Sequence, residues 1–102
     1  MTSIIVDNHF SGTCAAVQAR PVTITAALDQ DPIVTLPDRA KFQFANLAPG
    51  RHCLTFYSVG APMEGGHGTE VLRFNASAGG TEFVELGCAA DGSVSLSGPS
   101  AR

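Results

Sequence analysis

The side chains of this chain that could bind a metal ion or act as nucleophiles are its histidines and cysteines. There are three of each, namely His9, His52, His67, Cys14, Cys53 and Cys88. Imidazole nitrogen and thiolate sulfur are ligands that zinc and copper prefer. However, the sequence has no Cys-x-x-Cys or His-x-x-x-His pair, and adjacent residues such as His52 and Cys53 point to opposite faces of a strand. We therefore predict no metal site, with metal or small-ligand binding by these side chains as the alternative.

The sequence contains no recognisable catalytic motif. A nucleophilic thiol or hydroxyl needs a neighbouring base, and no nucleophile elbow or similar local signature is present. The nine acidic residues are spread thinly, so no pair is selected for acid–base catalysis. The glycines of residues 60–68 are not followed by the Lys-Ser or Lys-Thr of a phosphate-binding loop. We predict that the protein is not an enzyme, with no catalytic residues and no cofactor.

The charge distribution bears on the class of partner. The formal net charge is −3 at pH 7, and the six cationic residues are scattered along the chain. A nucleic-acid surface needs clustered cations, so we expect no nucleic-acid binding. No apolar run is long enough to span a bilayer. Residues 1–7 lack the basic and apolar segments of a signal peptide, so we expect a cytoplasmic protein without a membrane span, with a secreted mature form as the alternative.

The three cysteines are far apart and odd in number, so they cannot all pair within one chain. In a reducing cytoplasm such cysteines are buried or half-buried thiols. We therefore predict three reduced, structural thiols. One disulfide with a third cysteine left free is the alternative.

The pattern of apolar residues predicts the fold class. The 102 residues are of the size of one domain. Apolar residues alternate with polar ones in short segments, and glycine or proline interrupts them roughly every 8–12 residues, which is typical of sandwiches. We predict an all-β fold, a single antiparallel β-sandwich of about seven to nine short strands. The sandwich is expected over residues 1–97, with a flexible C-terminal tail at residues 98–102.

Residues 42–59 are expected to form the central hairpin of this sandwich. Phe42 and Phe44 alternate with polar neighbours in the first arm, and Leu54 and Phe56 share one face of the second. Between the arms, Ala48-Pro49-Gly50-Arg51 fits a type II turn, in which proline fixes φ at the second position and glycine takes a positive φ at the third. A second hairpin is predicted at Asp91-Gly92.

The segment from Phe42 to Leu54, with its Asn-Leu-Ala-Pro-Gly turn, resembles the small β-sandwich modules of the PEGA-like, transthyretin-like and carboxypeptidase-regulatory-like groups. Val22-Thr23-Ile24 before it and Ala78-Gly79-Gly80-Thr81 after it belong to the same pattern, which covers about residues 22–86. Domains of this kind are accessory or adhesion modules. The resemblance therefore implies a non-catalytic role and no catalytic residues.

Two regions are candidates for contact with a partner. Residues 60–68 form the longest stretch without periodicity, and its Met63, Glu64 and His67 are the predicted binding residues. The other candidate is an exposed strand edge. Residues 3–6 are apolar on both faces, so this strand lies either centrally in its sheet or at an edge that recruits another chain. We predict an interaction or assembly module, with a protein partner or self-association into a homo-oligomer.

Overall fold

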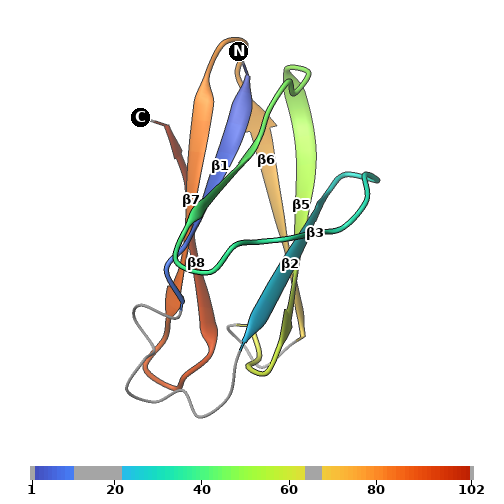
Figure 1. The fold of residues 1–102 in the computed structure, drawn as a ribbon. Helices are drawn as coiled ribbons and strands as arrows, with labels where there is room; N and C mark the ends of the chain where they lie inside the picture. Colours follow the sequence, from blue (N-terminus) through green and yellow to red (C-terminus); the bar gives the residue numbers. More distant parts are fainter. Residues whose placement is uncertain (1, 11–21, 64–67, 102) are drawn as a thin grey trace.

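The structure is a computed structural model that describes residues 2–10, 22–63 and 68–101 of the chain. These residues form eight β-strands: β1 (Ser3–Asn8), β2 (Thr23–Leu28), β3 (Val34–Thr35), β4 (Lys41–Phe44), β5 (Gly50–Val59), β6 (Thr69–Ala76), β7 (Thr81–Cys88) and β8 (Val94–Ala101). Sheet A has the order β4-β1-β7-β8, and sheet B has the order β3-β2-β5-β6. The two sheets face each other in a sandwich, seen edge-on in Figure 1. The predicted all-β sandwich is thus confirmed.

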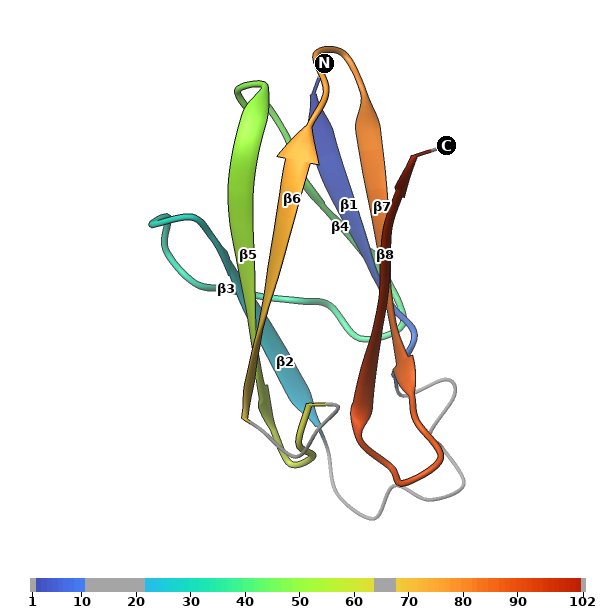
Figure 2. The ribbon, with the colours of Figure 1, turned by 180° about the vertical axis from the view of Figure 1, so that it is seen from behind.

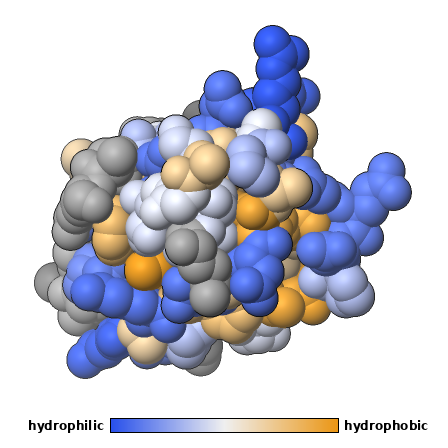
Figure 3. Space-filling model, turned by 90° about the horizontal axis from the view of Figure 1, so that it is seen from above, coloured by the Kyte–Doolittle hydropathy of each residue, from blue (hydrophilic) through white to orange (hydrophobic). Residues whose placement is uncertain are grey.

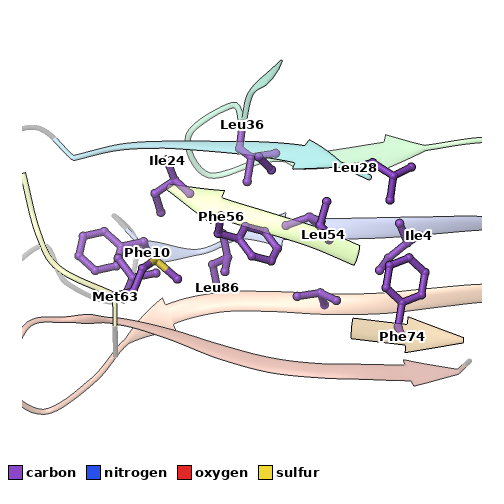
Figure 4. Packing of buried hydrophobic residues seen from close by; sticks show 14 of the residues in the cluster. Ile4, Phe10, Ile24, Leu28, Leu36, Leu54, Phe56, Met63, Phe74 and Leu86 are labelled. Carbon is purple, nitrogen blue, oxygen red and sulfur yellow. The ribbon is translucent and has the colours of Figure 1, made fainter. Parts of the chain in front are cut away.

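The core lies between the two sheets and is filled by the apolar side chains that alternate along the strands. Ile4 and Val6 of β1, Leu54 and Phe56 of β5, and Leu86 of β7 are all 0% exposed. Figure 4 shows the core side chains of the two sheets packed against each other, with Phe74 of β6 at one end of the core. Full burial of a large apolar side chain contributes roughly 1.5–3 kcal/mol, so this shared core holds the two sheets together.

Strand β1 is central in sheet A. It pairs antiparallel with β4 and parallel with β7, where Ser3 lies opposite Thr81. The prediction of an antiparallel sandwich therefore fails at this one pair. The reason is that the connection between β6 and β7 ends beside the start of β1, where the Ser3 amide donates to the Gly80 carbonyl at 3.1 Å. With neighbours on both sides, the apolar β1 is not a free edge.

The predicted central hairpin is wrong, because its two arms lie in opposite sheets. β4 pairs with β1 in sheet A, whereas β5 pairs with β2 and β6 in sheet B. Residues 45–49, which we call the arch, cross the sandwich between them, as the green segment of Figure 1 shows. Alternation alone cannot separate the two arrangements, because a hairpin and an arch both direct Phe44 and Phe56 toward the core.

The second predicted hairpin is confirmed, although its loop is longer than the two residues of the signal. β7 and β8 are joined by residues 89–93. The Gly92 amide donates to the Ala89 carbonyl at 3.0 Å, and Gly92 has φ of 85°, as in a turn that ends in a glycine bulge. Asp91 Oδ1 accepts hydrogen bonds from the Ser93 hydroxyl at 2.6 Å and the Ser93 amide at 3.0 Å, which lower the pKa of Asp91.

Two further findings differ from the sequence predictions. β8 continues through Ala101, which pairs with Glu82, in the region where the sequence predicts a flexible tail. Cys88 is disulfide-bonded, while Cys53 is a free, half-buried cysteine. The prediction of reduced thiols is therefore wrong for Cys88, and Cys14 lies outside the described residues.

In the part of the chain that the structure describes, no helix is long and apolar enough to cross a membrane.

Candidate functional site

The first predicted binding residue, Met63, is part of the core. Its side chain is 0% exposed and lies beside Phe10 (Figure 4). Met63 forms a bridge with Val94, and the Val94 amide donates to the Pro62 carbonyl at 2.9 Å. The prediction of an exposed contact at Met63 is wrong, because a long apolar side chain gains more by filling the interior than by facing water. Glu64 and His67 lie outside the described residues.

The second predicted region, an exposed strand edge, is found on β6. Each sheet has two edge strands, which are β3 and β6 in sheet B and β4 and β8 in sheet A. β3 has two residues and is flanked by Pro32 and Pro37, β4 is short and begins with Lys41, and β8 contains Pro99. Such features discourage pairing with another chain. β6 has eight residues and no proline, so it is the least protected of these edges (Figure 2).

The backbone of β6 directs alternate groups away from the sheet. Gly68 accepts a hydrogen bond from the Ser58 amide at 3.2 Å, and β6 then pairs antiparallel with β5. In an antiparallel ladder every second residue exchanges hydrogen bonds with its partner, so the even-numbered residues of β6 bond to β5. The N–H and C=O groups that point outward are those of Thr69, Val71, Arg73 and Asn75.

The side chains of these same four residues lie on the outer face of sheet B. All four are exposed, and Val71 is 42% exposed. The residues between them face the core, where Phe74 and Ala76 are buried. Among the described residues, no strand pairs with this side of β6, so β6 offers a row of outward-pointing backbone groups beside an exposed apolar side chain.

A cluster around His52 closes the arch against sheet B. His52 Nδ1 lies 2.7 Å from Asp29 Oδ2, and His52 Nε2 lies 2.6 Å from the Ala48 carbonyl oxygen. The ring also stacks on Phe74, with centroids 5.6 Å apart. At Asp29, which has φ of 52°, the chain leaves β2. The Asp29 Oδ1 atom accepts a hydrogen bond from the Cys53 amide at 2.9 Å, where a further strand residue would offer its backbone carbonyl.

The electrostatics of this cluster follow from its hydrogen bonds. Both groups that face the His52 ring are acceptors, so they favour the protonated ring, in which both nitrogens donate. The Ala48 carbonyl, followed by the Asp29 carboxylate, raises the pKa of His52. The Cys53 amide, followed by His52, lowers the pKa of Asp29. With both nitrogens already bonded, His52 joins three segments of chain, and this geometry does not present it as a catalytic base.

An open hollow of about 510 Å³ lies on the β5–β6 ladder near the arch. It is lined by Arg51, His52, Cys53, Arg73, Phe74 and Asn75. Figure 3 views the sandwich from the end at which β5 begins and β6 finishes, and strongly hydrophilic side chains project there around less polar surface. The hollow thus combines cationic and amide side chains with the Cys53 thiol.

The described residues do not gather metal ligands. Among residues 2–10, 22–63 and 68–101, no group of three or more His, Cys, Asp and Glu side chains is placed to hold an ion. His9 pairs with Asp7 at 2.9 Å, far in sequence from His52, and Cys88 is disulfide-bonded. The alternative of metal binding therefore gains no site from this part of the chain.

Sequence reasoning missed both the β6 edge and the hollow. Residues 69–76 carry no local signal for an edge, because the interior strands β1, β2, β5 and β7 lack proline as well. The hollow depends on the register that sets Cys53 opposite Arg73, which has no local signature. Comparison of the chain with known protein families, with curated protein sequences and with solved structures found no match.

Proposed function

We propose that this chain is a non-catalytic interaction module that associates with a second copy of itself through β6. The observation that carries the proposal is that β6 is an eight-residue edge strand without proline. Free backbone groups on such a strand provide hydrogen bonds to an added strand, and neighbouring side chains provide specificity. The accessory or adhesion role implied by the sequence resemblance is of the same kind.

Charge restricts how two copies of β6 pair. When two copies of β6 pair antiparallel about a two-fold axis, the residue on the axis lies opposite itself in the second copy. A residue a given number of positions before it then lies opposite the residue the same number of positions after it. A pair centred on Glu70 or on Arg73 places two like charges directly opposite, which is destabilising. A pair centred on Val71 instead sets the two exposed valines against each other, with Arg73 opposite Thr69 of the second copy. We therefore assign this register to the association.

The proposed interface continues sheet B across the two copies. Val71 lies opposite Thr55 of β5, which in turn lies opposite Ala27 of β2. These three residues are uncharged and of small or medium size, so the central row of the joined sheet carries no charge. β-branched residues such as valine and threonine are favoured in such rows.

The test is sedimentation equilibrium of the protein from micromolar to near-millimolar concentrations, with two variants at Val71. Val71→Lys places two ammonium groups opposite each other and should raise the dimer dissociation constant at least tenfold, or about 1.4 kcal/mol. Val71→Thr keeps a β-branched residue and should change the dimer dissociation constant little. Circular dichroism and denaturant midpoints check that both variants are folded.

Hydrogen exchange adds a second readout. The amides of Thr69, Val71, Arg73 and Asn75 should exchange quickly in dilute protein and slow down as the dimer forms, whereas that of Leu72 should be slow throughout. A wild-type protein that stays monomeric at every concentration would rule out the second copy as partner. Slow exchange of the four amides in the monomer would rule out the β6 edge itself.

A further inference from the structure

Two arginines, Arg51 and Arg73, line the hollow on the β5–β6 ladder. Arg51 lies opposite Asn75, and Cys53 lies opposite Arg73. Residues two apart on a strand share a face, so these four side chains stand together on the outer face. The two arginines are diagonal neighbours, which places their Cβ atoms within roughly 7–8 Å and their long side chains within reach of one ligand.

These arginines have no carboxylate to neutralise them within the described residues. The ion pairs there join His9 to Asp7 and His52 to Asp29. Asp29 contacts two of the residues that line the hollow, and its two oxygens already accept hydrogen bonds from His52 and Cys53. Two like charges on one face repel each other, and an anion between them removes that repulsion.

The chemistry of the hollow favours a carboxylate. Guanidinium groups match the two oxygens of a carboxylate in bidentate geometry, and the amide of Asn75 is a further donor. Phosphate sites usually add backbone amides at a helix N-terminus or in a nest. Within the paired stretch here, the β5 and β6 backbone groups lie in the plane of the sheet and do not point out of its face.

We infer that the hollow is a binding site for a carboxylate ligand, held by Arg51 and Arg73 with Asn75 as an additional donor. Two sources carry this chemistry, namely a free polycarboxylic acid or the acidic side chains of a peptide. The site uses side chains on the face of the sheet, whereas the proposed association uses the backbone edge of β6. The carboxylate site and the association through β6 can therefore be disproved independently of each other.

The test is an NMR titration of isotope-labelled protein with citrate and, separately, with a capped peptide of alternating glycine and glutamate. The arginine Nε–Hε resonances of Arg51 and Arg73 and the side-chain amide of Asn75 should shift and saturate at millimolar ligand. Sodium chloride at matched ionic strength controls for screening, since an exposed charge pair is sensitive to salt. Titrations run at a protein concentration below any self-association.

Variants distinguish specific carboxylate binding in the hollow from general electrostatic attraction of anions to the protein. Arg51→Gln and Arg73→Gln should each weaken binding about tenfold, whereas Lys41→Gln, which removes an exposed cation on sheet A, should leave it unchanged. Saturation by citrate alone, by the peptide alone or by both supports the site and identifies its source. The inference is overturned if neither ligand saturates, if sodium chloride gives the same shifts, or if Lys41→Gln weakens binding as much as Arg73→Gln.

Discussion

At the scale of single residues, His52 is the side chain on which three parts of the chain converge. It belongs to β5, bonds to Asp29 at the end of β2, and bonds to Ala48 in the arch. The His52 side chain is 12% exposed and that of Asp29 is 43% exposed, so the contact between them is open to water on the Asp29 side. Because only the protonated ring can donate from both nitrogens, the attachment of the arch depends on the protonation of His52.

The first prediction concerns pH. Because the pKa of His52 is raised on folding, its stabilisation is fully present below the unfolded value of 6.5 and is lost as pH rises through the higher folded value. Asp29 acts in the opposite direction, since its lowered pKa gives stabilisation that is lost as pH falls below 3.8 through the folded value. Urea midpoints of the wild type should therefore decline above about pH 6.5 and again in acid.

The matched variants for this prediction are His52→Gln and His9→Gln. The first removes the titrating group and should flatten the decline above neutral pH, while the second changes an exposed histidine whose Nε2 pairs with Asp7 at 2.9 Å. An unchanged alkaline decline in His52→Gln would show that other groups cause it.

The cysteines give a second prediction at the same scale. Cys53 is free and half-buried, whereas Cys88 is disulfide-bonded. Iodoacetamide followed by peptide mass spectrometry should label Cys53 in the unfolded, non-reduced protein and label Cys88 after reduction only. Labelling of Cys88 without reductant would contradict the disulfide. Structural disulfides are typical of oxidising compartments, so the expectation of a cytoplasmic location loses the support of reduced thiols.

At the scale of elements, the arch is the connection that distinguishes this sandwich from the predicted hairpin. Asn46 has φ of 61° and Gly50 has φ of 121°, so the chain turns twice through backbone conformations that most side chains disfavour. The Leu47 amide donates to the Thr2 carbonyl at 2.9 Å, which fixes the arch to the start of the chain. Thr2 is itself held, since its hydroxyl accepts the Gly79 amide at 2.9 Å.

The third prediction tests the arch through Gly50. A Cβ added there meets no atom within 4 Å, so Gly50→Val adds backbone strain without a steric clash and should cost about 1–3 kcal/mol. Gly68 also has open space around its Cβ position, but its φ lies outside the left-handed region. Gly68→Val should thus change the free energy of unfolding by about 0.5 kcal/mol at most. Equal costs in a denaturant series would show that the positive φ of Gly50 is not the cause.

The strands themselves were predictable, because a period of two reports which side of a strand faces the core. Ile24 of β2 and Phe74 of β6 are buried as this pattern requires, and Val71 is exposed. The same pattern is silent about which sheet a strand joins, so it could not show that β4 and β5 belong to different sheets. The contact between His52 and Asp29 joins residues 23 apart and depends on that sheet assignment.

At the scale of the whole molecule, each sheet combines strands from separate parts of the chain: β1, β4, β7 and β8 in sheet A, and β2, β3, β5 and β6 in sheet B. The chain passes from sheet A to sheet B and back through the arch and the other connections, so each sheet is completed by segments distant in sequence. This explains why composition and periodicity predicted a sandwich but gave no strand order. It also explains why the prediction of an exposed Met63 failed, since the position of Met63 in the core is set by Val94 and Phe10 from other parts of the chain.

The placement of β1 has a consequence for the order in which the protein is made. The described strands of sheet B lie between Thr23 and Ala76, so a ribosome has supplied each of them by the time Ala76 emerges. Sheet A requires Ser3 to pair with Thr81, 78 residues later, and β8 follows only after that. β1, which is apolar on both faces, must therefore wait until β7 has been translated before its second neighbour exists. Nascent chains that stall before β7 would expose it to chaperones and to one another.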